Sequence, residues 1–196
     1  MTATAAEPVR EAALVSLLRR DPWRMRRLAT VEALGLPDCW IGAGFVRSAV
    51  WDALHDRPPS VPDGDVDVVW FDRARASVGD DRAVEAVLAA DDPATRWSVK
   101  NQARMHARNG DPCYVSTADA LRAWPESATA VAVRSRGSDV DVLAPYGLDD
   151  LFALIVRPTP PFADAKRPVV LSRVRDKRWL ERWPLLRFAE PVAVAS

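Results

Sequence analysis

The sequence predicts an α+β protein, in which a small mixed β-sheet is flanked by helices. Segments with apolar residues at helical spacing are interspersed with short segments in which apolar residues alternate or run together. They do not follow the strict strand–helix–strand order of a doubly wound parallel sheet. The chain has 196 residues, 48% of them hydrophobic, which predicts one main domain with a substantial core.

The first part of the chain is expected to form four helices and two strands. Asp21 and Pro22 are typical of a helix start, with the aspartate as N-cap and the proline in the first turn. Gly35 is expected to end that helix, and the proline-rich segment 57–64 to form a loop. The predicted helices are 9–19, 22–35, 44–54 and 81–90, and the predicted strands are 38–41 and 66–71.

The second part combines further helices with a β-hairpin. Apolar alternation predicts two strands, joined by a turn at Arg136-Gly137-Ser138. Ser116 or Thr117 is expected to cap a short helix, and Pro184 to stop a basic closing helix. The predicted strands are 128–134 and 140–143, and the predicted helices are 98–108, 117–123, 149–156 and 172–183.

Composition limits the classes of function. We expect an N-terminal helix with a mobile start over 1–20, a single domain over 21–188 and a tail over 189–196. The formal net charge is zero, which argues against a protein steered to duplex nucleic acid by bulk charge, although a local basic patch stays possible. No secretory segment or membrane span is evident, so a cytoplasmic protein without a membrane partner is expected.

Two stretches carry the chemistry. Residues 41–47 read as a strand, a glycine turn at Gly42 and Gly44, and a helix start with Arg47; this arrangement suits a phosphate group. Residues 64–72 read as a strand that carries Asp65 and Asp67, whose side chains project from one face. Adjacent carboxylates on an apolar strand repel each other unless a cation lies between them, so a divalent metal site is predicted.

These motifs resemble the nucleotidyltransferase superfamily of DNA polymerase β and the CCA-adding enzymes. The spacing of Gly44 and Arg47 resembles the CCA-adding and poly(A) polymerase branch, and residues 22–184 as a whole resemble a bacterial family of nucleotidyltransferase-like proteins. Matching stretches are 97–106, 116–120, 124–126 and 144–152. The sequence departs from the superfamily at Ala43, where glycine is usual, and in the 21 positions from Gly44 to Asp65.

The resemblance implies a third metal-binding carboxylate on a later strand. Asp141 is the better match, and Asp139 on the same face is the alternative. It also implies Mg²⁺, with Mn²⁺ as a possible substitute, held by Asp65, Asp67 and Asp141.

Other polar residues allow two interpretations each. Lys100 and Asn101, at the expected start of a helix, could bind the triphosphate or the base; otherwise they lie on the wet face of an amphipathic helix. Arg47 could pair structurally with Asp52 or Asp72 instead of facing a substrate. The basic closing helix is expected to dock an apolar face and to solvate its charges.

The leading hypothesis is a Mg²⁺-dependent transfer of a nucleoside monophosphate from an NTP to an acceptor hydroxyl, with release of pyrophosphate. The acceptor is unidentified; a small one is expected, and nucleic acid is less favoured because of the neutral charge. The alternative is a non-catalytic nucleotide-binding or protein-interaction module that retains the fold. The sequence leaves the oligomeric state open.

Overall fold

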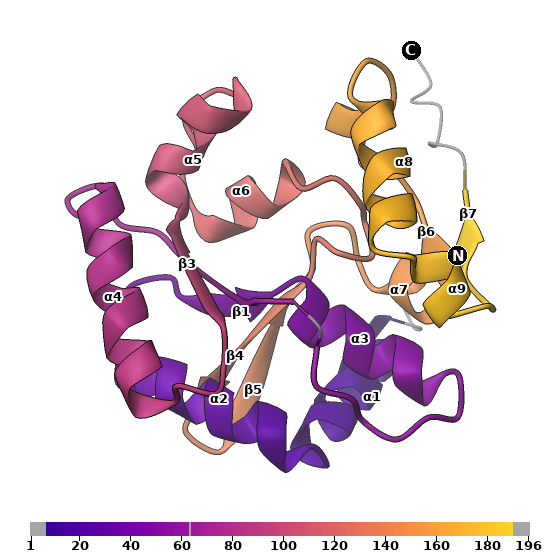
Figure 1. Ribbon diagram of the computed structural model, residues 1–196, viewed down its shortest axis with the longest axis horizontal. Helices are drawn as coiled ribbons and strands as arrows, with labels where there is room; N and C mark the ends of the chain where they lie inside the picture. The colour runs from indigo at the N-terminus through magenta and orange to yellow at the C-terminus, as the bar shows by residue number, and fades with distance from the viewer. Residues whose placement is uncertain (1–6, 63, 190–196) are drawn as a thin grey trace.

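A computed structural model describes residues 7–62 and 64–189, and it has a five-stranded mixed sheet at its centre (Figure 1). The strand order is β3-β2-β1-β4-β5. β2 and β3 are parallel, and the other neighbouring strands are antiparallel. The strands are β1 Trp40–Gly42, β2 Val66–Trp70, β3 Trp97–Asn101, β4 Ala132–Arg136 and β5 Asp139–Leu143. The predicted α+β class is confirmed.

Helix α1 packs against α2 and α3, all three contact the sheet, and α4 packs on β3 (Figure 1). The short helices α5 and α6 contact each other beyond the end of β3. The helices are α1 Glu7–Arg19, α2 Pro22–Ala33, α3 Gly44–Ala53, α4 Val78–Asp91, α5 Gln102–Asn109, α6 Thr117–Arg122, α7 Asp149–Phe152, α8 Arg167–Asp176 and α9 Trp179–Arg182. A 3₁₀ turn occupies Pro160–Phe162.

The last part of the chain forms a helical arm beside α3. We call residues 167–182, which comprise α8, the two residues after it and α9, the C-terminal arm. The ring of Trp51 in α3 meets the rings of Trp179 and Trp183 edge-on, with centroids 5.6 and 5.1 Å apart. Trp183 Nε1 donates a hydrogen bond of 2.8 Å to Asp52 Oδ1, so that the arm is tied to α3 by packing and by a buried polar contact.

Local sequence signals predicted several elements well. The Asp21 side chain caps α2 by accepting a hydrogen bond from the Arg24 amide at 3.1 Å, and Ser116 caps α6. The hairpin turn lies where it was predicted, between Arg136 and Asp139. α4 begins earlier than predicted because Ser77 and Asp80 form a reciprocal capping box.

The helix predicted for 98–108 is wrong in its first part. Residues Trp97–Asn101 form β3, which pairs in parallel with β2, and only Gln102–Asn109 is helical. The side chains of β3 alternate between buried and half-buried, as expected of a strand with one face on the core. Pairing with β2 across about 30 residues of sequence therefore overrides the local helical preference.

Other boundaries also differ from the prediction, and β1 begins at Trp40 and α8 at Arg167. The helix predicted for 149–156 ends at Phe152, and Ile155–Val156 forms β6, which pairs with β7 at Arg187–Phe188. The basic closing helix is divided in two, because Arg178 adopts a left-handed conformation with φ 52°. β4 starts at Ala132 instead of residue 128. The divided helix allows Trp179 and Trp183 to face Trp51.

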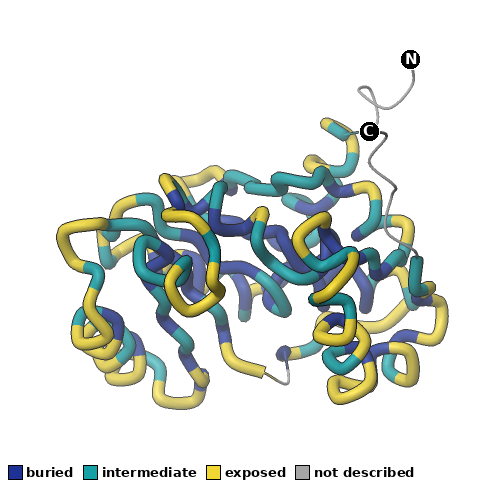
Figure 2. The backbone as a smooth tube through the Cα atoms, turned by 90° about the horizontal axis from the view of Figure 1, so that it is seen from above, coloured by how far each residue is buried: buried dark blue, intermediate teal, exposed yellow. Residues whose placement is uncertain are grey.

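The core lies between the sheet and its helices, and buried segments run through the middle of the molecule while exposed ones surround it (Figure 2). No helix of the described residues has the length and apolar character needed to cross a membrane. The predicted mobile start and most of the predicted tail, 1–6 and 190–196, lie outside the described residues.

Candidate active site

The turn between β1 and α3 presents a helix N-terminus at the end of the sheet. Ala43, the N-cap residue, has φ 54° and ψ −123°, a conformation that residues other than glycine rarely adopt. Its carbonyl accepts hydrogen bonds from the amides of Val46 and Arg47 at 3.2 and 3.0 Å. The amides of Gly44 and Phe45 have no acceptor within the helix at this position, so they suit an anionic ligand.

Two carboxylates lie beside this helix end. Asp67 in β2 is directly opposite Gly42 of β1, and Asp65 precedes β2 by one residue. Asp65 Oδ1 is 3.2 Å from Arg96 Nε, and its side chain is 52% exposed. Within 7–62 and 64–189, the Asp67 carboxylate makes no hydrogen bond or ion pair. It is therefore available to a ligand.

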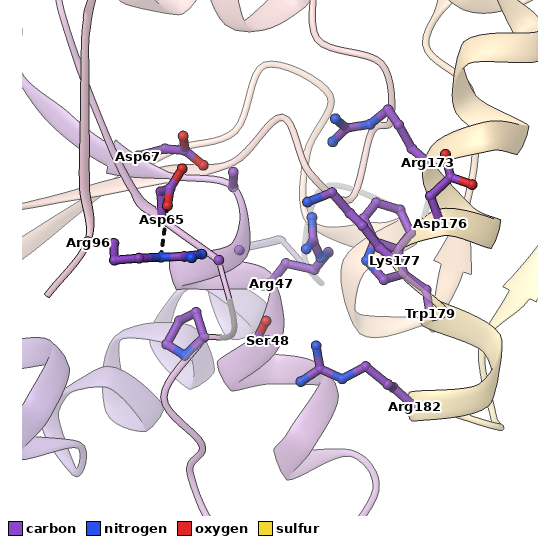
Figure 3. A pocket seen from close by; sticks show the side chains of 14 residues that line it. Arg47, Ser48, Asp65, Asp67, Arg96, Arg173, Asp176, Lys177, Trp179 and Arg182 are labelled. Atoms are coloured by element: carbon purple, nitrogen blue, oxygen red, sulfur yellow. Dashed lines mark ion pairs between the residues drawn. The ribbon is translucent and has the colours of Figure 1, made fainter.

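Both carboxylates line a cavity of about 550 Å³ (Figure 3). The turn, the segment before β2 and the C-terminal arm form its walls, and cationic side chains outnumber carboxylates there. The lining residues are Ala43, Gly44, Arg47, Ser48, Pro62, Gly64, Asp65, Asp67, Arg96, Arg173, Asp176, Lys177, Trp179 and Arg182.

Arg47 is buried at the inner side of this cavity and is only 6% exposed. Its Nη1 donates to Thr129 Oγ1 at 2.9 Å, and its guanidinium lies 4.2 Å from the ring centroid of Trp179. Among the described residues its Nε finds no hydrogen-bond acceptor. Burial lowers the pKa of Arg47 to about 10, so the side chain stays protonated at neutral pH. It is not paired with Asp52 or Asp72, the structural partners considered from sequence.

The C-terminal arm supplies cations on the opposite side. Arg173 donates from Nε and Nη2 to the two carboxylate oxygens of the fully buried Glu126, at 2.7 and 3.4 Å. Lys177 follows one helical turn later, and Arg182 comes from α9. In Figure 3 the side chains of Arg173 and Lys177 extend from the arm toward the two carboxylates.

Charges of like sign are crowded on each side of the cavity. Burial first, and then the nearby Asp65, raise the pKa of Asp67, against the opposing effect of Arg47, Lys177 and Arg173. Burial first, and then Arg173 and Arg47, lower the pKa of Lys177. The carboxylate side is thus suited to a cation and the arm side to an anion.

Of the predicted phosphate-binding residues, Gly44 and Arg47 line the cavity and Gly42 does not. A Cβ atom at Gly42 would lie 2.9 Å from Trp124 Cη2 and 3.2 Å from the carbonyl oxygen of Val131. Gly42 therefore has a structural role, because its position leaves no room for a side chain.

Lys100 and Asn101 lie in β3 and do not line the cavity. Lys100 Nζ donates to its neighbour Val99 O at 2.9 Å. Asn101 is fully buried, caps α5 and donates from Nδ2 to the carbonyls of Asp72 and Arg75, each at 2.7 Å. The structure thus gives Asn101 the role of joining loop 71–76 to the sheet.

The structure does not bring Asp141 to the cavity. β5 is three strands from β2, which corresponds to about 14 Å at the usual strand spacing. Asp141 Oδ2 accepts from Arg134 Nε at 2.9 Å, and Asp139, the alternative, lies 3.3 Å from Arg19 Nη2. Among the described residues no group of three or more His, Cys, Asp or Glu is placed to hold a metal. Any metal at Asp65 and Asp67 would need further ligands from substrate or water.

Sequence reasoning missed the arm and Arg96 as parts of the site. The arm's apolar face does dock, as predicted, but its cations Arg173, Lys177 and Arg182 line the cavity. The available signal was the four-residue spacing of Arg173 and Lys177, which places both on one helix face next to Trp179.

The comparisons with known proteins agree with this geometry. A family model described as a nucleotidyltransferase matches residues 29–188. The chain belongs to this nucleotidyltransferase family. A solved structure described as a CCA-adding enzyme head domain is 34% identical, with a TM-score of 0.79, and the match covers 90% of this chain and 94% of that one.

More distant structures share the fold of this nucleotidyltransferase. A CCA-adding enzyme in complex with CTP has 16% identity and a TM-score of 0.57, over 92% of this chain and 43% of that one. A complex with ATP has 19% identity and a TM-score of 0.53, over 90% and 42%. The chain thus spans less than half the length of these two enzymes. A comparison with curated proteins gave no match.

Proposed function

We propose that this nucleotidyltransferase transfers a nucleoside monophosphate from an NTP to an acceptor hydroxyl, depends on Mg²⁺ and releases pyrophosphate. The observation that carries the proposal is a single cavity shared by Asp65, Asp67, the N-terminus of α3 and a set of cations. Carboxylates suit the metal, while the helix end and the cations suit the phosphates.

The carboxylates fit Mg²⁺ bound jointly by protein and nucleotide. Mg²⁺ is usually held by one or two carboxylates together with substrate phosphates and water, which matches the pair Asp65 and Asp67. Their crowding, which contributes to the raised pKa of Asp67, would be relieved by a divalent cation between them. A bound metal ion would offset the charge of the phosphates during transfer, and Mn²⁺ accepts the same ligands.

The other residues would orient the nucleotide. Arg47 and the amides of Gly44 and Phe45 would hold phosphate oxygens, so that the α-phosphorus lies near the carboxylates. The acceptor hydroxyl oxygen attacks that phosphorus and releases its proton to solvent, the bond to the bridging oxygen of the β-phosphate breaks, and pyrophosphate leaves with the electron pair. Asp141 has no part in this proposal because it lies outside the cavity.

The fold shared with CCA-adding enzymes solved with CTP and with ATP supports an NTP as the donor. The formal net charge of zero provides no general attraction for a long nucleic acid. We therefore propose a small hydroxyl compound as the acceptor.

The test is Mg²⁺-dependent NTP binding and turnover by Asp65→Asn and Asp67→Asn. Calorimetric titration of each NTP, with Mg²⁺ and with EDTA, measures binding, and pyrophosphate release in the presence of cell extract measures transfer. Loss of either carboxylate should reduce transfer by about 100-fold or more. Asp139→Asn removes an exposed acid outside the cavity and serves as the matched control. Unchanged Mg²⁺-dependent NTP binding in both site variants would contradict the proposal.

The same assay separates the enzyme from a non-catalytic module. Mg²⁺-dependent NTP binding without pyrophosphate release, across all NTPs and extract fractions, would favour a nucleotide-binding module. Asp141→Asn should behave like wild type, because Asp141 is paired with Arg134 away from the cavity.

A further inference from the structure

We propose that the C-terminal arm carries a binding site for inorganic polyphosphate, formed by Lys177, Arg173 and Arg182. Its ligands would be the β- and γ-phosphates of the NTP and the pyrophosphate product. The proposal rests on the proposed function for the identity of these ligands, and it assigns their recognition to a part of the chain remote in sequence from the carboxylate motif.

The first argument is position. Arg173 in α8 and Lys177 at the C-cap of that helix extend into the cavity, opposite Asp65 and Asp67 on the sheet side (Figure 3). A nucleotide whose α-phosphate lies at the carboxylates would have its remaining phosphates available to the arm. The cavity volume of about 550 Å³ is within the usual range for small-molecule sites.

The second argument is positive charge that has no ion-pair partner among the described residues, at the exposed Lys177 and at the buried Arg47. Within the described ranges, Lys177 makes no hydrogen bond or ion pair, and the buried Nε of Arg47 lacks an acceptor. A buried donor without a partner is destabilising, and this applies to Arg47 Nε. Burial first, and then repulsion from the neighbouring Arg173 and Arg47, lower the pKa of Lys177. An anion rich in oxygen acceptors would relieve both costs.

Of the three carboxylates that line the cavity within the described residues, Asp67 attracts Lys177, but neither it nor Asp65 or Asp176 forms an ion pair with that lysine. Asp65 is paired with Arg96 at 3.2 Å, and Asp176 is paired with Arg175 at 3.2 Å. Neither is ion-paired with Lys177, so the arm presents a net positive surface to the cavity. This surface suits phosphate oxygens better than an uncharged group.

The third argument is that the arm is held in place before any ligand binds. Glu126 fixes Arg173 through two hydrogen bonds, and Trp179 packs edge-on against Trp51. Little side-chain or helix ordering would then be needed on binding, which favours affinity for a small anion.

The experiment is calorimetric titration with inorganic pyrophosphate in EDTA, which isolates the arm from any metal contribution. Wild type is expected to bind, Lys177→Gln to bind about tenfold more weakly, and Lys177→Arg to retain most affinity. Arg178→Gln is the matched control, because Arg178 is 72% exposed, pairs with Glu181 and does not line the cavity. Thermal unfolding of each variant verifies that it is folded.

Three outcomes would overturn the inference: no pyrophosphate binding by wild type, equal binding by Lys177→Gln, or equal weakening by Arg178→Gln. Weaker binding of a single-stranded RNA oligonucleotide by Lys177→Gln, with pyrophosphate affinity unchanged, would reassign the arm to the acceptor.

A double variant with Asp65→Asn and Asp67→Asn separates this inference from the proposed function. It should lose transfer and keep metal-free pyrophosphate binding. If it keeps both, the proposed function fails while the arm site stands. If it loses pyrophosphate binding, the site does not belong to the arm alone.

Discussion

Ala43→Gly should stabilise the protein, because the native backbone at this turn is one that glycine adopts and alanine resists. Ala43 has φ 54° and ψ −123°, and its amide and carbonyl are both held, the amide by a 3.1 Å hydrogen bond to Val131 O. Strain of this kind in a residue with a Cβ atom costs about 2 kcal/mol. The conformation therefore persists because the surrounding contacts fix it.

Two losses reduce the expected gain. Glycine increases the conformational entropy of the unfolded chain, which costs about 0.4–1 kcal/mol. Glycine also loses the methyl group of Ala43. A fully buried methyl group contributes about 0.8 kcal/mol to stability, so this half-buried one contributes a few tenths of a kcal/mol. A net gain of about 1 kcal/mol remains, which corresponds to a rise in melting temperature of about 2–4 °C for a chain of this size.

The assay is urea and thermal unfolding of wild type, Ala43→Gly and Ala86→Gly. Ala86 is exposed within α4, so glycine there should destabilise by about 0.5–1 kcal/mol. Opposite signs for the two substitutions are expected. If Ala43→Gly lowers stability as Ala86→Gly does, the positive φ at Ala43 imposes no strain and the reasoning is refuted.

Two further predictions concern the same site. Asp67→Asn should be more stable than wild type at neutral pH in EDTA. The pKa of Asp67 is raised in the folded state, so the stability of the wild type falls as the pH rises from the ordinary pKa of 3.8 through the raised pKa. The variant has no carboxyl group at this position and does not lose this stability. Urea unfolding at pH 3 and pH 7 checks it, and an advantage that does not grow with pH would contradict it. Gly42→Ala should destabilise the protein by about 1–3 kcal/mol, because the added Cβ atom would lie 2.9 Å from Trp124 Cη2. Gly64 has open space around it, so Gly64→Ala should not destabilise the protein. Equal effects of the two substitutions in thermal unfolding would disprove the steric explanation.

Local interactions explain what could be read from the sequence. Asp21 and Ser116 cap helices through bonds that span three residues, and the hairpin between Arg136 and Asp139 is set by its own turn. The pairing of Asp65 and Asp67 at one cavity follows from their separation by two residues. Gly44 and Arg47 share a helix turn, which places both at the same end of α3.

Contacts between distant residues decided the rest. β3 is a strand because it pairs with β2, and Asn101 is consequently a buried cap that does not line the cavity. Asp141 lies outside the cavity because the order of strands puts β5 at the far edge of the sheet.

The sequence by itself determined the sheet-and-helix class, the helix end and the carboxylate pair, since each depends on neighbours a few residues apart. Only the tertiary structure decided which charges face that pair. Trp183 meets Asp52 across 131 residues, and this contact brings Lys177 and Arg173 opposite Asp67. No periodic pattern in the sequence predicts a contact between residues so far apart in the chain, because the contact arises from the packing of the arm against α3.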